Sequence, residues 1–243
     1  LGRVLAKVPG MKRVAPKFGA QQVPDLLASK GQIHAAATQE VLMRTWYVET
    51  GKGVKAQAIA HLRDTGRKGL AGRTATTRHL LGADKNAMCS PRLVKPRPEF
   101  ADASLALGDV VQAPERYIFK NPQAYEYIKR AQQITKEMYD IAVSEGVKVN
   151  QVGLEPFEEF VHWVCRGRKN KITGELESAR RGSRAVGGIV PSMKTRRFQS
   201  MADGIKAGNV YANDLEIYVG SYIDDMFKAI ADRHLSEGIT EVV

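Results

Sequence analysis

Apolar residues in this chain recur at helical spacing over several long segments, and the alternation of apolar and polar residues that marks a strand is almost absent. The clearest segment covers residues 114–144, with a potential break at Pro122 and a stop signal at Gly146. Another covers residues 213–235, where Asn213 can cap the first turn. The pattern predicts a mainly α protein, folded as an irregular helical bundle.

Shorter helical segments are predicted between and before these two. The pattern is weak over 18–31 and clearer over 33–49, 54–63, 154–164 and 195–207. Gly51 and Gly53 are expected to end the helix over 33–49, because glycine is a poor helix former. Glu216 is expected at the third position of the last helix, where it can complete a capping box with Asn213.

The segment between the two halves of the chain has a different composition. Residues 64–113 are rich in Gly, Thr, Arg and Pro, which predicts a long irregular connection that crosses over another element. We therefore divide the chain into an N-terminal helical region with a basic arm, residues 1–113, and a C-terminal helical region, residues 114–243. The second region contains a basic loop over residues 165–197.

The charge is strongly uneven along the sequence. The chain has 37 Lys and Arg against 26 Asp and Glu, a net charge of +11. Residues 1–20 hold five basic residues and no acid, residues 161–200 hold ten basic residues against two acids, and residues 201–243 hold eight acids against three bases. Such polarisation favours an anionic partner on one side of the molecule, and nucleic acid is the commonest one.

Most of the ten basic residues in the second cluster are arginines, whose planar fork binds phosphate bidentately, and Gly and Ser among them allow close backbone approach. We predict contacts to the DNA phosphate backbone without base specificity. The alternative is a basic loop that is merely solvated. The predicted contact residues are Arg166, Arg168, Lys169, Lys171, Arg180, Arg181, Arg184, Lys194, Arg196 and Arg197.

Signals for catalysis are weak. Tyr222–Asp225 matches the Tyr-x-Asp-Asp metal box of reverse transcriptases, but its flanks have helical period and predict a helix face instead of a hairpin tip. Glu155 and Glu159 lie one helical turn apart, which is more typical of an exposed acidic face than of a metal site. We predict no enzyme, no cofactor and no metal; a metal enzyme using Glu155, Glu159 and Asp224 stays as a third alternative.

The cysteines and tryptophans are predicted to have ordinary structural roles. Cys89 and Cys165 have no zinc-type spacing and are predicted to be reduced thiols. Trp46 and Trp163 lie in helical apolar stripes and are predicted to pack in a core or an interface. No apolar window is long enough for a membrane span. Because the chain begins at Leu1, we expect it to be cut from a longer protein.

Four short strings follow one another in a characteristic order. They are Ala113-Pro114-Glu115-Arg116-Tyr117, Glu145-Gly146-Val147-Lys148-Val149, Met193-Lys194-Thr195-Arg196-Arg197-Phe198, and Gly204-Ile205-Lys206-Ala207-Gly208-Asn209-Val210-Tyr211. With these strings, residues 110–235 resemble a region of large phage-encoded proteins, including polyvalent proteins and virion-associated or internal proteins of tailed phages. The resemblance carries no catalytic residues and implies a basic, mostly helical module packed beside DNA or other particle proteins.

The leading hypothesis is therefore a non-enzymatic, virion-associated structural protein of a tailed phage, as an internal, ejection or connector component. Its expected partners are DNA, other virion proteins and further copies of itself, and its expected place is the phage particle, after synthesis in the host cytoplasm. The alternative is a nucleic-acid-binding subunit of a ribonucleoprotein or of a phage nucleic-acid-processing protein.

Overall fold

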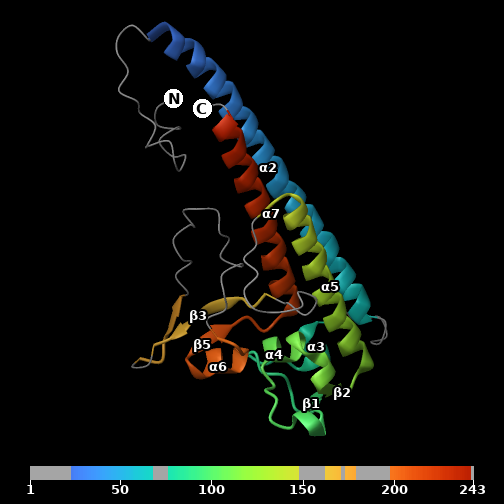
Figure 1. Cartoon of the computed structure of the whole chain (residues 1–243). Helices are drawn as coiled ribbons and strands as arrows, with labels where there is room; N and C mark the ends of the chain where they lie inside the picture. Colours follow the sequence, from blue (N-terminus) through green and yellow to red (C-terminus); the bar gives the residue numbers. More distant parts are fainter. Residues whose placement is uncertain (1–22, 68–75, 148–161, 171–172, 179–197, 242–243) are drawn as a thin grey trace.

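The computed structural model of the chain describes residues 23–67, 76–147, 162–170, 173–178 and 198–241 (Figure 1). In these residues the protein is mainly helical, as predicted. Three long helices form its frame: α2 (Val23–Arg67), α5 (Pro122–Ser144) and α7 (Leu215–Glu241). Helix α2 lies along α7, and α5 packs against both, so that the first and the last helices of the described chain lie side by side.

Helix α2 runs through both glycines that were expected to end it, so the predicted division into helices over 33–49 and 54–63 is wrong. Gly51 is buried against Phe227 of α7, and a Cβ atom at Gly51 would lie 2.7 Å from the Cβ of Phe227. The missing side chain allows the two helices to approach closely. Packing along α7 therefore outweighs the cost of about 1 kcal/mol that glycine imposes on a helix interior.

The start of α7 differs from the predicted cap. Asp214, not Asn213, caps the helix, because its Oδ1 accepts a hydrogen bond from the backbone N–H of Glu216 at 3.0 Å. The Asn213 side chain instead donates to the carbonyl of Asp84 at 3.0 Å. Glu216 is thus the second helical residue and forms no capping box. The helix extends to Glu241, and the Tyr222–Asp225 string lies within it, as predicted.

Helix α5 begins later than predicted. Pro114–Arg116 form a 3-10 turn, η4, and Tyr117–Phe119 form strand β2, which pairs antiparallel with β1 (Val94–Pro96). Tyr117 is buried, and its hydroxyl donates to the carbonyl of Ser104 at 2.6 Å. Asn121 then caps α5 through the N–H of Gln123, and Pro122 occupies the first helical position, where its missing N–H is tolerated.

The predicted irregular connection is largely structured in its described part. It contains α3 (Thr77–Leu81), β1, η3 (Pro98–Phe100) and α4 (Leu107–Gln112). Buried side chains of these elements, including Leu80, Val94 and Val110, belong to the same hydrophobic core as those of α5 and α7. The sequence did not predict these elements, because they are too short to show the periodic apolar spacing of a helix or a strand.

A second sheet replaces part of the predicted basic loop. Strand β3 (Cys165–Lys169) lies between β4 (Leu176–Ser178) and β5 (Asn209–Tyr211), and both pairings are antiparallel. Helix α6 (Met201–Lys206) is shorter than the helix predicted over 195–207. Residues 154–161 of another predicted helix lie outside the described residues, and residues 162–164 are not helical. Trp163 packs into the core.

Candidate nucleic-acid interface

Three of the ten predicted contact residues, Arg166, Arg168 and Lys169, lie within the described part of the chain, on β3. The remaining seven, together with the basic arm over 1–20 and the carboxylates of Glu155 and Glu159, lie outside it. They are Lys171, Arg180, Arg181, Arg184, Lys194, Arg196 and Arg197. The interface is therefore built here from β3 and its neighbours.

The three basic side chains of β3 are exposed, whereas Gly167 between them is buried. Arg166 is the extra residue of a bulge, since Cys165 pairs with Tyr211 and Gly167 with the adjacent Val210. A bulge turns the side chain of the extra residue away from the regular alternation. The bulge thus helps β3 to present two arginines and a lysine to solvent within four positions.

Gly167 determines how closely β4 can approach β3. A Cβ atom at this position would lie 2.3 Å from the backbone carbonyl oxygen of Glu177, a distance that no side chain can meet without a backbone shift. The β3–β4 pair, which we call the hairpin, is closed by a turn in which the N–H of Gly174 donates to the carbonyl of Asn170 at 3.0 Å. Gly174 has a φ of +70°, which favours glycine.

The one acidic residue of β4, Glu177, forms no ion pair with a base of β3 among the described residues. Although Glu177 lies opposite Arg168 in register, its Oε1 accepts from the Asn170 side-chain amide at 2.6 Å. Arg168 instead donates through Nε to the carbonyl of Ala207, the residue that caps the end of α6, at 3.3 Å. Among the described residues, Arg166 and Lys169 have no ion-pair partner.

The hairpin is fixed to the body through β5 and α6. The carboxylate of Asp109, on α4, accepts from the backbone N–H groups of Met201 and Ala202 at 2.6 and 3.1 Å. It thus caps the first turn of α6 from another element, while Ser200 caps the same turn locally through the N–H of Asp203. Tyr211, at the end of β5, is buried. Its ring packs edge-on against that of Trp163, with 6.2 Å between the two ring centroids.

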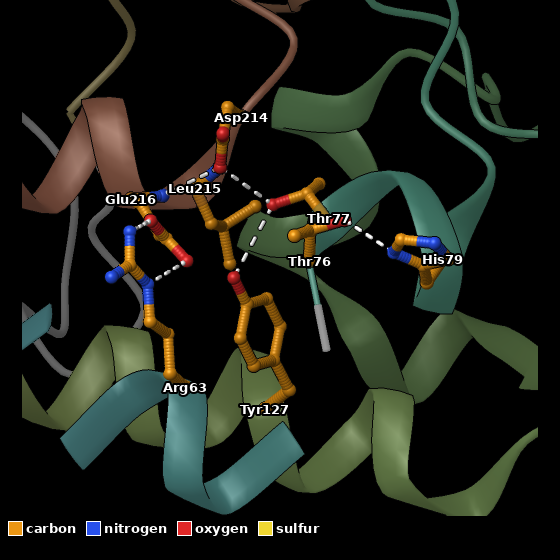
Figure 2. A network of polar contacts seen from close by, with 8 residues as sticks. All are labelled: Arg63, Thr76, Thr77, His79, Tyr127, Asp214, Leu215 and Glu216. Carbon is orange, nitrogen blue, oxygen red and sulfur yellow. Dashed lines mark hydrogen bonds and ion pairs between the residues drawn. The ribbon is translucent and has the colours of Figure 1, made fainter. Parts of the chain in front are cut away.

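A second polar cluster joins four helices at the base of the bundle (Figure 2). Buried Thr77, at the start of α3, donates to Asp214 Oδ1 at 3.0 Å and accepts from the backbone N–H of Leu215 at 2.8 Å. The hydroxyl of Tyr127, from α5, lies 3.4 Å from the hydroxyl oxygen of Thr77. We call Arg63, Thr77, Tyr127, Asp214 and Glu216 the base network.

The base network is closed within the chain. Since the single proton of Thr77 goes to Asp214, its two lone pairs accept from Leu215 and Tyr127, which uses the full capacity of the hydroxyl. Arg63 binds Glu216 through two bonds, of 3.0 and 2.7 Å. Burial raises the pKa of Tyr127, which keeps the phenol protonated as a donor. This arrangement stabilises the fold.

The two cysteines are free, as predicted, but their surroundings differ. Cys89 is buried, and burial raises its pKa to about 12, so that the thiol stays protonated at neutral pH. Cys165, at the start of β3, is exposed.

Asp224, considered in the sequence as a metal ligand, forms an ion pair with Lys55 at 2.5 Å. In the described residues no three His, Cys, Asp or Glu side chains gather as a metal site would require.

Comparisons with known proteins add no relative: no family model, curated protein or solved structure matches the chain. Within the described residues, the helices also lack an apolar stretch long enough to cross a bilayer.

The sequence did not predict two residues that fix the starts of helices, Asp109 beside the interface and Thr77 in the base network. Thr77 and Asp109 lie in the segment predicted as irregular, and each acts on the start of a helix distant in sequence. The order Thr76-Thr77 before Leu80 and Leu81 was a usable signal for α3, because threonine often precedes a helix. The long-range contact of Asp109 with α6 had no local signal.

Proposed function

We propose that this protein is a non-enzymatic, virion-associated structural protein of a tailed phage, an internal, ejection or connector component, and that it contacts packaged DNA through its phosphates. The observation that carries the DNA contact is β3, a strand held at both edges whose three basic side chains face solvent. The phage context rests on the sequence resemblance over residues 110–235.

The chemistry of β3 suits a phosphate backbone. Phosphates along one DNA strand recur every few ångströms, so a row of exposed cations can engage several of them, and each contact releases condensed counterions. Arginine contributes a fork that matches phosphate oxygens, and lysine contributes a point charge. Such contacts carry no sequence information, which is the mode expected for a protein packed against a whole genome.

The acid-rich C-terminal part of the chain supports the same proposal, because several of its carboxylates are occupied elsewhere. Glu216 binds Arg63, and Asp224 binds Lys55, both on α2. Asp203 lies 3.8 Å from Lys206, its neighbour on α6. These carboxylates pair with bases outside β3.

The test is binding of the purified chain to random-sequence duplex DNA over a salt series. The first variant changes Arg166, Arg168 and Lys169 to Ser; the matched control changes Arg92, Lys95 and Lys120, which are also exposed but lie in and beside the β1–β2 sheet. The slope of log K against log salt should become shallower by about 2 to 3 in the first variant, since each lost phosphate contact removes about 0.9.

The control should keep the wild-type slope. An equal change in both variants would show that only net charge matters and would contradict a contact at β3. A parallel series with duplex RNA separates the two nucleic acids: clearly tighter binding to RNA would support the ribonucleoprotein alternative over the virion proposal.

A further inference from the structure

The side of α2 that faces away from the bundle carries a regular row of residues. Their spacing alternates between four and three positions, which is the heptad spacing that keeps one seam of a helix against a second helix. The row, which we call the α2 stripe, consists of Leu42, Trp46, Glu49, Gly53, Ala56 and Ala60, and all six are exposed.

The exposure of the large members is unusual for their type. The exposed fraction is 66% for Leu42 and 59% for Trp46, and Val41 beside them is 55% exposed. The opposite side of α2 is the one that packs inside the molecule, since Gly51 is buried against α7 and Leu62 belongs to the core. In Figure 1, α2 forms the edge of the long-helix frame, with α7 and α5 on one side of it.

The stripe is complementary to itself when its direction is reversed. Its large residues, Leu42 and Trp46, lie at one end, and its small residues, Gly53, Ala56 and Ala60, lie at the other. A two-fold axis beside position 51 would place Trp46 against Ala56 of a second copy and Leu42 against Ala60. Large side chains would then meet small ones at each of these positions, as close packing requires.

The charges favour the same direction. Glu49 and Lys52 form an exposed ion pair of 2.5 Å near the centre of the stripe. In the reversed arrangement, Glu49 lies opposite Gly53 of the second copy and beside its Lys52, so opposite charges meet. A parallel arrangement would set Glu49 against Glu49 and Trp46 against Trp46, which is unfavourable both in charge and in volume.

We infer that the α2 stripe is the interface of an antiparallel homodimer, in which α2 of one copy packs against α2 of a second copy. This inference does not depend on DNA binding, because the stripe and β3 share no residue. From Leu42 to Ala60 the stripe is about 27 Å long at 1.5 Å per residue. Such a contact is smaller than those of most obligate dimers, so the dimer should dissociate on dilution.

The first experiment is sedimentation velocity of the full chain, from about 1 to 200 µM, a range in which a micromolar dimer changes from monomer to dimer. Ala56→Arg places a long charged side chain where Trp46 of the second copy would pack. Ile118→Arg is the matched control, because Ile118 is 52% exposed on β2, away from α2. We expect a dimer for the wild type and the control, and at least a twentyfold weaker dimer for Ala56→Arg.

Each variant is checked for an unchanged melting temperature. Gly53→Gln is the second variant, because a Cβ atom at Gly53 meets no atom within 4 Å and the monomer can accept a side chain there. A wild type that stays monomeric over the whole range would overturn the inference. So would a dimer that neither Ala56→Arg nor Gly53→Gln weakens.

The second experiment tests direction by disulfide cross-linking, with exposed Cys165 changed to Ser. Leu42→Cys and Ala60→Cys proteins are prepared separately. Under mild oxidation a mixture of the two should cross-link, whereas each protein alone should not. Cross-linking of each protein with itself, and not of the mixture, would show a parallel pair and contradict the antiparallel arrangement.

Discussion

The base network and the hairpin both consist largely of polar side chains, yet the two regions use them in opposite ways. In the base network the hydroxyl of Thr77 donates to Asp214, and Arg63 donates to both carboxylate oxygens of Glu216. On the hairpin, Arg166 and Lys169 form no ion pair with a described acid, and Arg168 donates to the carbonyl of Ala207 at the end of α6. Closed polar groups fix a fold, whereas open ones are available to a ligand, so substitutions in the two regions should have separable effects.

The largest effect is expected from Thr77→Val in the base network. The change leaves buried Leu215 N–H without its acceptor and removes a partner of Asp214 and Tyr127. Unsatisfied buried groups should lower the free energy of unfolding by about 2 to 4 kcal/mol in urea denaturation. Thr76→Val is the control, since Thr76 is only half-buried and contacts His79; it should cost under about 1 kcal/mol. Equal losses would refute the special role of Thr77.

A smaller loss is expected from Asp109→Ala, which removes the acceptor of two N–H groups at the start of α6. By analogy with helix caps, the free energy of unfolding should fall by about 1 to 2 kcal/mol. Because α6 and β5 hold the hairpin, amide exchange over 209–211 should also become faster. Exposed Asp102→Ala serves as the control and should change neither quantity. Unaltered exchange in Asp109→Ala would mean that α6 is held by other contacts.

Alkaline pH should weaken the body of the protein progressively. Burial raises the pKa of Cys89 and of Tyr117 to about 12, from ordinary values of 9.0 and 10.0. Since the unfolded chain loses these protons first, their contribution to stability is complete below pH 9 and is lost as the pH rises toward 12. Urea midpoints measured between pH 7 and about 10.5 should therefore fall. If the urea midpoint of Cys89→Ala falls less with pH than that of the wild type, part of the effect belongs to the thiol. A wild-type midpoint that does not change with pH would contradict the prediction.

The smallest effect on stability is expected from changing Arg166, Arg168 and Lys169 to Ser. These side chains are exposed, and surface substitutions outside caps and cores alter the free energy of unfolding by about 0.5 kcal/mol or less. Thermal melting of this variant should match the wild type, while its binding to DNA weakens. A clear loss of stability would place the three residues with the base network, as structural groups.

The sequence predicted the long helices, because their apolar residues recur at helical spacing over many positions. Periodicity over dozens of residues predicted α5 and α7, and it predicted the helical character of α2. It failed at Gly51, where a tertiary contact with Phe227 decides the outcome, and at Tyr117, where strand pairing competes with helix formation. The DNA contact of the basic residues on β3 is a prediction made from charge alone. Their strand was not predicted, because Arg-Gly-Arg-Lys carries no strand pattern.

The most direct test of the contact at β3 is lysine footprinting. Purified protein is acetylated briefly with and without duplex DNA at low salt, and the modification of Lys169 and Lys95 is measured by mass spectrometry; both lysines are exposed. The account predicts that DNA protects Lys169, that Lys95 on β1 reacts at the same rate throughout, and that high salt abolishes the protection. Protection of Lys95 with Lys169 left reactive would contradict the proposed DNA contact.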